Sequence, residues 1–188
     1  MSTNLNYRIA QVDEELNEIL ALQSANHYTS LSPSEKNEQG FLTVRHSLAQ
    51  LQAMALAAPQ FIAFHESKLA GYVLTMTFDM KATVPSLAPL FEEFEEFSYN
   101  DLKLSEQPFV VCGQTCIHRD FRGMGIMHAL YNNMSRSLSS TYKGCITEIS
   151  ELNQRSLKAH AKIGFEIIHT YFDGQQHWNV VLWQWGQA

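Results

Sequence analysis

The stretch Arg122-Gly123-Met124-Gly125-Ile126-Met127 is the most informative part of this sequence. It follows the apolar run Phe109–Ile117, which is typical of a buried strand, and it opens residues 126–138, in which apolar residues recur at helical spacing. Glycines at the start of a helix let the backbone come close to an anion, and the free N–H groups of the first turn then point at it. The stretch therefore predicts a phosphate-binding turn, although a glycine turn of this kind can also be a simple connector.

Two familiar nucleotide-binding patterns do not fit this turn. The dinucleotide fingerprint needs a third small residue where His128 stands, and the chain does not open with that unit. The P-loop needs Gly-Lys-Ser/Thr at the start of the helix, and that sequence is missing here.

The N-terminal third of the sequence contains one strand and two helices. Residues 7–12 predict a strand, and Asp13 is expected to cap the helix that follows it. Residues 29–40 are polar and include proline and glycine, which favours a loop. Ser47 and Gln50 form a capping box ahead of a second helix, which should end before residue 59.

The rest of the sequence alternates between strands and helices. Apolar runs bounded by turn residues predict strands at Phe61–His65, 69–77, Phe109–Ile117, 145–150, Glu166–Phe172 and 178–185. Gly113 suggests a bulge within its strand, and Gly164 is expected to close a helix over 154–163. The order β-α-α-β-β-α-β-α-β-α-β-β predicts a mixed α/β fold with a central sheet and helices on both faces. No linker or repeat divides the chain, so residues 1–188 are expected to form one domain.

A second motif makes the pattern specific. Arg122-Gly123-Met124-Gly125-Ile126 resembles the acetyl-CoA motif of the GNAT superfamily of N-acetyltransferases. About 30 residues later, Asn153-Gln154-Arg155-Ser156 followed by Gly164-Phe165 resembles the second motif of that family. The resemblance implies that the fourth and fifth strands splay apart and that the pantetheine arm of acetyl-CoA lies between them.

The resemblance also implies which residues bind acetyl-CoA as co-substrate. The backbone N–H groups of Arg122, Gly123, Met124, Gly125, Ile126 and Met127 would hold the pyrophosphate. The backbone of Thr115, Cys116 and Ile117 would pair with the pantetheine and aim an N–H at the thioester oxygen. Asn153 and Ser156, which follow the fifth strand, would contact the pantetheine or the phosphates.

Two residues depart from the family pattern, and a third is a candidate base. Met127 stands where the phosphate motif usually has glycine or alanine, so its side chain is expected to point away and pack with Tyr131. His160 replaces a frequent tyrosine, and it either protonates the leaving CoA thiolate or only packs beside it. Glu148 lies on a strand beside the expected cleft, where it is either the general base for the amine or a structural carboxylate.

Composition excludes several classes of protein. With 13 basic and 19 acidic residues the net charge is −6, which argues against binding to nucleic acid. Three cysteines (Cys112, Cys116 and Cys145) form no disulfide or metal-binding pattern, which favours a reducing compartment. There is no signal peptide and no apolar run long enough to span a membrane, so a cytoplasmic protein without a membrane partner is expected.

These observations predict an acetyl-CoA-dependent N-acetyltransferase in which a primary amine attacks the thioester directly. The acceptor, a small molecule or a peptide, is not readable from the sequence, and a homodimer remains open. One alternative is a catalytically silent CoA-binding sensor or scaffold on the same fold. Another is an interaction module that docks a partner through Phe91, Phe94 and Phe97. The glutamates between these phenylalanines either form a solvated helix face or attract cationic amines.

Overall fold

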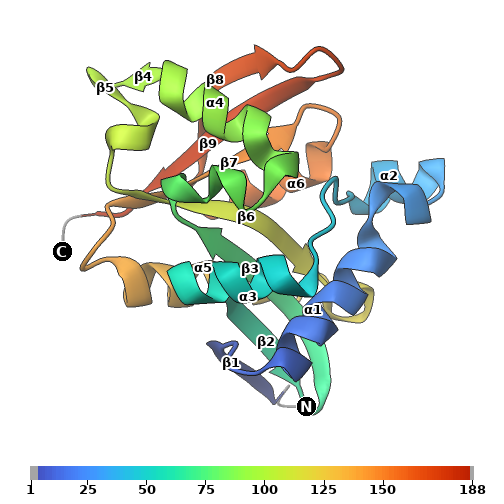
Figure 1. Ribbon diagram of the computed structural model, residues 1–188. Coiled ribbons are helices and arrows are strands. Elements are labelled where there is room, and N and C mark those ends of the chain that lie inside the picture. The colour runs from blue at the N-terminus through green and yellow to red at the C-terminus, as the bar shows by residue number, and fades with distance from the viewer. Residues whose placement is uncertain (1–3, 187–188) are drawn as a thin grey trace.

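A mixed sheet of seven strands organises the computed structural model, which describes residues 4–186 (Figure 1). The strand order is β1-β2-β3-β6-β7-β9-β8, and every neighbouring pair is antiparallel except β6 and β7. The strands are β1 Leu5–Ile9, β2 Phe61–His65, β3 Lys68–Met76, β6 Phe109–Ile117, β7 Gly144–Ser150, β8 Glu166–Phe172 and β9 His177–Gln184. A separate small hairpin joins β4 Ser98–Tyr99 to β5 Leu102–Lys103.

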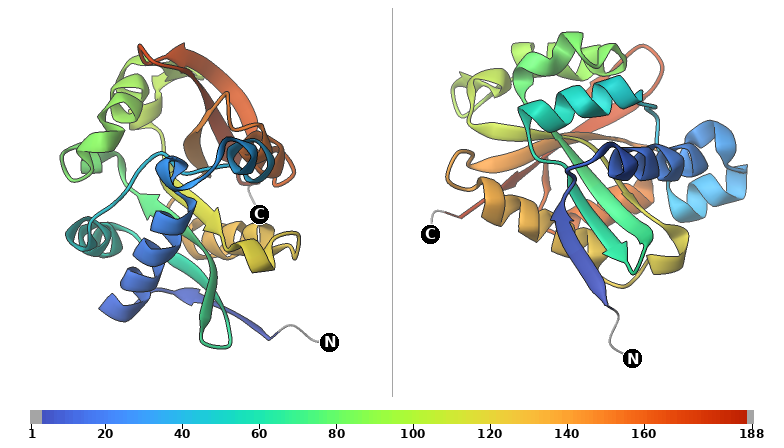
Figure 2. Two further views of the ribbon diagram at one scale, coloured as in Figure 1. Left: turned by 90° about the vertical axis from the view of Figure 1, so that its right-hand side faces the viewer. Right: turned by 60° about the horizontal axis from the view of Figure 1, so that its bottom comes forward.

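Helices cover both faces of the sheet, as the sequence predicted. They are α1 Asp13–Asn26, α2 Pro33–Gln39, α3 Leu48–Ala57, α4 Ala88–Glu96, α5 Ile126–Leu138 and α6 Gln154–Ala161. Figure 2 shows α1, α3 and α4 on one side of the sheet and α5 and α6 on the other. Successive residues of a strand are buried in two separate hydrophobic cores, one on each face of the sheet. Tyr72 and Leu74 lie in the first core, and Val73 between them lies in the second. The period of two therefore buries both faces of the central strands. Within residues 4–186, no helix is both long and apolar enough to cross a membrane.

The parallel strands β6 and β7 separate after three residue pairs. Their pairing begins at Phe109 and Gly144 and ends at Val111 and Ile146, although both strands continue beyond that point. The facing edges of the two strands are therefore free of each other toward their carboxyl ends. This confirms the splayed fourth and fifth strands that the resemblance implied.

A bulge at Gly113 accompanies this separation. In the pairing of β3 with β6, Leu74 lies opposite Gln114 and the next residue, Thr75, lies opposite Cys112, so Gly113 has no partner. A Cβ atom at this position would lie 2.7 Å from the terminal methyl carbon of Met76, which is closer than carbon atoms normally pack. The predicted bulge is confirmed, and a larger residue at this position would require the Met76 side chain to move.

The prediction of a loop over residues 29–40 was wrong. Residues 28–30 form a short 3-10 turn and Pro33–Gln39 form α2, which packs on α6. Ser32 caps the helix: its hydroxyl accepts from the Glu35 backbone N–H at 3.3 Å, and the Glu35 carboxylate accepts from the Ser32 backbone N–H at 2.9 Å. This capping box was visible in the sequence, but α2 has no buried residue and therefore no apolar periodicity.

Element ends differ from prediction by a few residues. Val12 is the N-cap of α1, and Asp13 is its first helical residue. Helix α6 ends at Ala161, and Gly164 lies in the following turn with φ of 117°. The capping box of α3 and the hairpin turn between β8 and β9 are confirmed.

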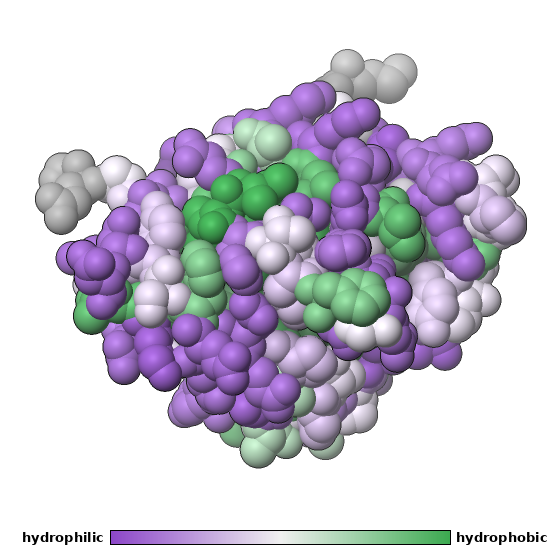
Figure 3. All heavy atoms as spheres, turned by 90° about the horizontal axis from the view of Figure 1, so that it is seen from above, coloured by the Kyte–Doolittle hydropathy of each residue, from purple (hydrophilic) through white to green (hydrophobic). Residues whose placement is uncertain are grey.

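Helix α4 turns its phenylalanines inward. Phe91 and Phe94 are buried in the first core, while Glu92 and Glu95 are exposed and bond to Lys81. A partner could not dock through side chains that the core already encloses, so the interaction-module alternative is wrong for this helix. Seen from the α4 side, the surface is mostly hydrophilic with apolar residues gathered near its centre (Figure 3).

Candidate active site

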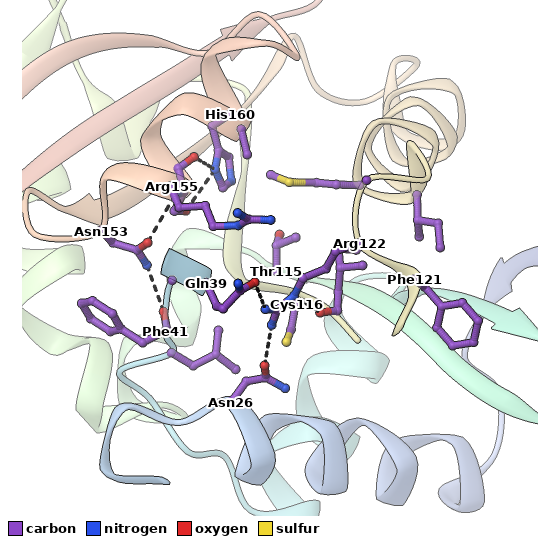
Figure 4. Close-up of a pocket in the computed structure, with 18 of the residues that line it drawn as sticks. Asn26, Gln39, Phe41, Thr115, Cys116, Phe121, Arg122, Asn153, Arg155 and His160 are labelled. Atoms are coloured by element: carbon purple, nitrogen blue, oxygen red, sulfur yellow. Dashed lines mark hydrogen bonds between the residues drawn. The ribbon is translucent and has the colours of Figure 1, made fainter. Parts of the chain in front are cut away.

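A cavity of about 220 Å³ lies where β6 and β7 separate. Its walls come from the end of β6, the glycine turn that follows, the start of α6 and residues 39–42, which lead out of α2 (Figure 4). These segments are far apart in the chain and meet because the strands diverge. The arrangement leaves an apolar cleft with polar backbone at one end.

The glycine turn presents unpaired backbone donors to this cavity. Gly123 and Gly125 have φ angles of 80° and 77°, a left-handed conformation that glycine adopts without strain, and Gly125 is the N-cap of α5. Within the described part of the chain, the N–H groups of residues 123–128 have no hydrogen-bond partner. A Cβ atom added at either glycine would meet nothing within 4 Å, so a ligand can reach the backbone. Free N–H groups at a helix N-terminus form an anion-binding site.

The Arg122 side chain ties this turn to the N-terminal helices. Its guanidinium donates to Asn26 Oδ1 at 2.7 Å and to Gln39 Oε1 at 2.8 Å, and its Nε donates to the Ile117 carbonyl at 3.1 Å. Figure 4 shows Arg122, Gln39 and Asn26 pointing toward one another. The side chain therefore braces the cavity, which leaves the backbone of the turn free for a ligand.

Asn153 links the start of α6 to the opposite wall of the cavity. Its Oδ1 accepts from the backbone N–H of Ser156 at 3.2 Å, which caps the helix. Its Nδ2 donates to the Phe41 carbonyl at 3.0 Å, an interaction drawn in Figure 4. Because both ends of the amide are in use, Asn153 holds residues 39–42 across the cleft.

His160 lies at the junction of two cavities as a neutral imidazole. Its Nδ1 is 2.9 Å from the carbonyl oxygen of Ser156, which can only accept, so Nδ1 carries the proton. Its Nε2 then accepts from the Tyr131 hydroxyl at 2.9 Å, and that hydroxyl is also 2.9 Å from Thr115 Oγ1. Burial lowers the pKa of His160 to about 4 because an imidazolium would lose its hydration. At neutral pH the residue is therefore uncharged.

Glu148 faces a second, smaller cavity between β6 and β7. Its Oε2 accepts a short hydrogen bond from the Tyr171 hydroxyl, and its Oε1 has no partner among the described residues. Burial raises the pKa of Glu148 to about 7, and the nearby Asp173 and Glu93 raise it further against the lowering effect of Tyr171. A carboxyl group with this pKa can take up and release a proton near neutral pH.

The sequence matches a family model over residues 18–165, and that model describes the acetyltransferase (GNAT) family. The chain belongs to the GNAT acetyltransferase family. No curated protein matches the sequence significantly.

Solved structures similar to this GNAT chain support the fold. The Escherichia coli ribosomal-protein-S18-alanine N-acetyltransferase is 11% identical with a TM-score of 0.61, and the similarity covers 98% of this chain and 96% of that one. Arabidopsis thaliana Naa50, solved with a bisubstrate analogue CoA-Ac-MVNAL, is 19% identical with a TM-score of 0.61 over 96% and 99% of the two chains. Arabidopsis thaliana NAA60, solved with acetyl-CoA, is 14% identical with a TM-score of 0.61 over 96% and 99%.

Most residues that the GNAT motifs singled out line the first cavity. These are Thr115, Cys116, Ile117, Arg122, Gly123, Gly125, Ile126, Met127, Asn153, Ser156 and His160. Met124 is not among them and is 39% exposed, and Glu148 lines only the second cavity. Met127 packs against the core that contains Tyr131, as predicted, but it also lines the first cavity.

Several residues that line the first cavity were not predicted from the motifs. The missed residues are Asn26, Gln39, Gly40, Phe41, Leu42, Phe121, Arg155 and Ala159. Arg155 lies within the second motif and could have been noticed. The residues before 43 carry no local signal, because their role depends on α2 folding back against α6.

The three cysteines of this GNAT chain are unpaired and buried. Burial raises the pKa of Cys116 to about 12, so it is a protonated thiol at neutral pH. The Cys112 sulfur lies 3.2 Å from the Tyr131 hydroxyl and has no histidine among its hydrogen-bond partners. Hydrogen bonding with Cys145, and then with Thr115 and Tyr131, lowers the pKa of Cys112 although the thiol is buried. Tyr131 links this thiol to His160, but among the described residues no His, Asp or Glu lies within hydrogen-bond distance of either thiol to act as its base directly. Within residues 4–186, no group of three or more His, Cys, Asp or Glu residues lies close enough to hold a metal ion.

Proposed function

We propose that this chain transfers the acetyl group of acetyl-CoA to a primary amine, with both substrates bound at once. The observation that carries the proposal is the set of unpaired N–H groups of residues 123–128, which open onto the cavity between the splayed strands. An anion-binding turn at one end of an apolar cleft suits a cofactor with a pyrophosphate and a long uncharged arm.

Acetyl-CoA would be held by backbone groups of the chain and by a nearby cluster of basic side chains. The backbone of residues 122–127 would hold the pyrophosphate, and the unpaired edge of β6 at 115–117 would pair with the pantetheine. A third cavity shares Gly123 and Gly125 with the first and is lined by Arg155, Lys158 and Lys162. These cations would neutralise the remaining phosphate charge of the cofactor. Acetyl-CoA supplies the acetyl group as a thioester.

The amine would enter from the second cavity. The two cavities share lining residues, including Thr115, Ser156 and His160, so a group held in one can meet a group held in the other. Glu148 would take a proton from the ammonium form of the acceptor. The free amine would then attack the thioester carbon, and the carbon–sulfur bond would break to release the CoA thiolate. The nitrogen would give up its second proton to that thiolate or to solvent, which leaves the neutral amide. Holding both reactants in place contributes up to about 7–11 kcal/mol in well-oriented systems.

His160 has two candidate roles that differ in their pH dependence. As an acid it would first have to take up a proton at Nε2, which only accepts from Tyr131 in the neutral form, and then pass that proton to the thiolate through the Tyr131 and Thr115 hydroxyls, which connect it to the cavity. As a packing residue it would fix the orientation of those hydroxyls and leave the thiolate to take a proton from solvent. Substitution by phenylalanine slows thiol release specifically only in the first role.

The experiment is a calorimetric titration with acetyl-CoA, followed by a single-turnover assay of CoA thiol release with a mixture of primary amines. The proposal expects saturable binding and thiol release that depends on amine. Binding without amine-dependent release would favour the silent sensor. A folded protein that does not bind acetyl-CoA would refute the proposal.

A further inference from the structure

The cavity that contains Glu148 has a lining that restricts which amine it accepts. Its volume is about 90 Å³, less than half that of the first cavity. Strands β6 and β7 form two walls, and residues 41–44 form a third. Leu87 and Leu90 from the segment around α4, and Trp178 from β9, also line it.

Charge is distributed unevenly between the cavities. Glu148 is the one acidic residue among the described residues that line the second cavity, and no lysine or arginine lines it. The one basic side chain there is His160, which is neutral at pH 7. By contrast, Arg122 and Arg155 line the first cavity. A cation entering the second cavity meets a carboxylate, whereas an anion entering it meets that same carboxylate and no cationic side chain among the described lining residues.

Most other polar side chains in this cavity already have partners. Gln114 Oε1 accepts from Tyr72 and Gln23, and its Nε2 donates to a backbone carbonyl at 2.9 Å. Thr147 donates to a backbone carbonyl at 2.7 Å, and Ser150 donates to a glutamine at 2.5 Å. Glu148 Oε1 is left as the acceptor that faces the cavity. The rest of an acceptor molecule would lie beside Leu87, Leu90 and Trp178 and beside the unpaired backbone edges of β6 and β7.

The α4 segment is fixed against the edge of the sheet beside this cavity. Glu93 of α4 lies 2.6 Å from His169 of β8, and the Phe97 ring stacks on the same imidazole with 4.0 Å between ring centroids. Tyr171, two residues further along β8, holds Glu148. These contacts hold α4, which follows the cavity-lining Leu87 and contains Leu90, in a fixed position against β8.

We propose that the acceptor is a compact primary amine with no anionic group, bound with its nitrogen at Glu148 and its body beside Leu87, Leu90 and Trp178. This inference rests on the proposed transferase function. It disfavours free amino acids, because their carboxylate would meet no cationic side chain, and it disfavours peptide N-termini, because a volume of about 90 Å³ suits a compact body better than a peptide chain.

The test compares amines that differ in one group. Isoamylamine and leucine share an apolar body, and leucine adds a carboxylate. Leucinamide replaces that charge with a neutral amide, and a tripeptide amide beginning with leucine extends the chain. With acetyl-CoA saturating, kcat/KM for isoamylamine should exceed that for leucine and for the tripeptide by at least about 100-fold. Leucinamide should lie between isoamylamine and leucine. Equal or better use of leucine or the tripeptide would overturn the inference.

A variant at Thr43 tests directly whether the lack of a cationic side chain in the cavity sets the preference against a carboxylate. Thr43 lines the cavity and is only half-buried, so Thr43→Arg can add a positive charge there, with Thr43→Met as a neutral control of similar length. Thr43→Arg should raise kcat/KM for leucine relative to isoamylamine by about 10-fold or more, and Thr43→Met should not. An unchanged ratio in a Thr43→Arg protein with wild-type melting behaviour would count against the inference. If that variant does not fold, the amine series on the wild-type protein decides.

Failure of the two proposals can be told apart. Calorimetry of isoamylamine and leucine against the protein saturated with CoA measures acceptor preference without turnover. If acetyl-CoA does not bind, or no amine releases CoA thiol, the transferase function fails. If acetyl-CoA is consumed but leucine binds and reacts as well as isoamylamine, only the acceptor inference fails.

Discussion

Glu148→Gln should make the protein more stable at alkaline pH while removing most of its activity. The wild-type carboxyl group has a pKa of about 7, against an ordinary value of 4.5, because it is buried. A difference of about 2.5 units corresponds to about 3 kcal/mol of destabilisation once the group is ionised, as an upper limit. Glutamine carries no charge, and its amide oxygen can still accept from Tyr171.

The sign of the effect follows from which state holds the proton more tightly. Between pH 4.5 and 7 the folded state keeps the Glu148 proton that the unfolded state has lost, so wild-type stability should fall as pH rises through this window. The variant should lack this fall. At pH 8 it should melt up to about 10 °C higher than the wild type, since 1 kcal/mol shifts the melting temperature of a chain of this size by about 2–4 °C. At pH 4.5 the two proteins should melt together.

The acetyltransferase activity of Glu148→Gln should fall, although its stability at alkaline pH rises. Loss of a general base typically costs about 100-fold to 10,000-fold in turnover, and acetyl-CoA affinity should stay near the wild-type value. The assays are melting curves across pH, a pH–rate profile and a binding titration. Glu166→Gln is the control, because that carboxylate is exposed, does not line the cavity and does not affect the pKa of Glu148. If Glu148→Gln is less stable at pH 8 and keeps its turnover, Glu148 is a structural carboxylate and the reasoning fails.

Further predictions concern the cofactor, the thiols and the buried histidine. Gly125→Glu should abolish acetyl-CoA binding measured by calorimetry, whereas Gly174→Glu, at a glycine with similarly positive φ in the β8–β9 turn, should not; wild-type affinity in the first variant would contradict the placement. Cys112→Ala and Cys116→Ala should each keep their activity, and a stoichiometric acetyl-enzyme seen by mass spectrometry would overturn direct attack. His160→Phe should slow release of the CoA thiol, and His160→Tyr should restore much of the rate. Near wild-type release in His160→Phe would show that His160 is not the acid. Because the pKa of His160 is lowered to about 4, the stability it supports above pH 6.5 should be lost as pH falls toward 4, and acid melts of His160→Phe should lack that part of the loss.

The sequence by itself determined the elements whose cause is local. Apolar runs predicted the strands, and the glycine turn before α5 predicted a backbone with free N–H groups, because its conformation depends on neighbouring residues only. The bulge at Gly113 and the capping box of α3 were also readable, since each depends on residues within a few positions. The glycine turn at residues 122–126 and the second motif at residues 153–165, at their spacing in the chain, were sufficient to predict the fold and the family.

The tertiary structure alone decided how the cavity walls meet and what the catalytic candidates can do. Arg122 bonds to Asn26 across 96 positions in the chain, and Asn153 bonds to Phe41 across 112, so no local pattern records either contact. The pKa values of Glu148 and His160 depend on how far each side chain is removed from water, and burial is a property of the whole packed chain. Local conformation is set by short-range sterics and hydrogen bonds, whereas desolvation and cavity shape exist only after distant segments have packed together.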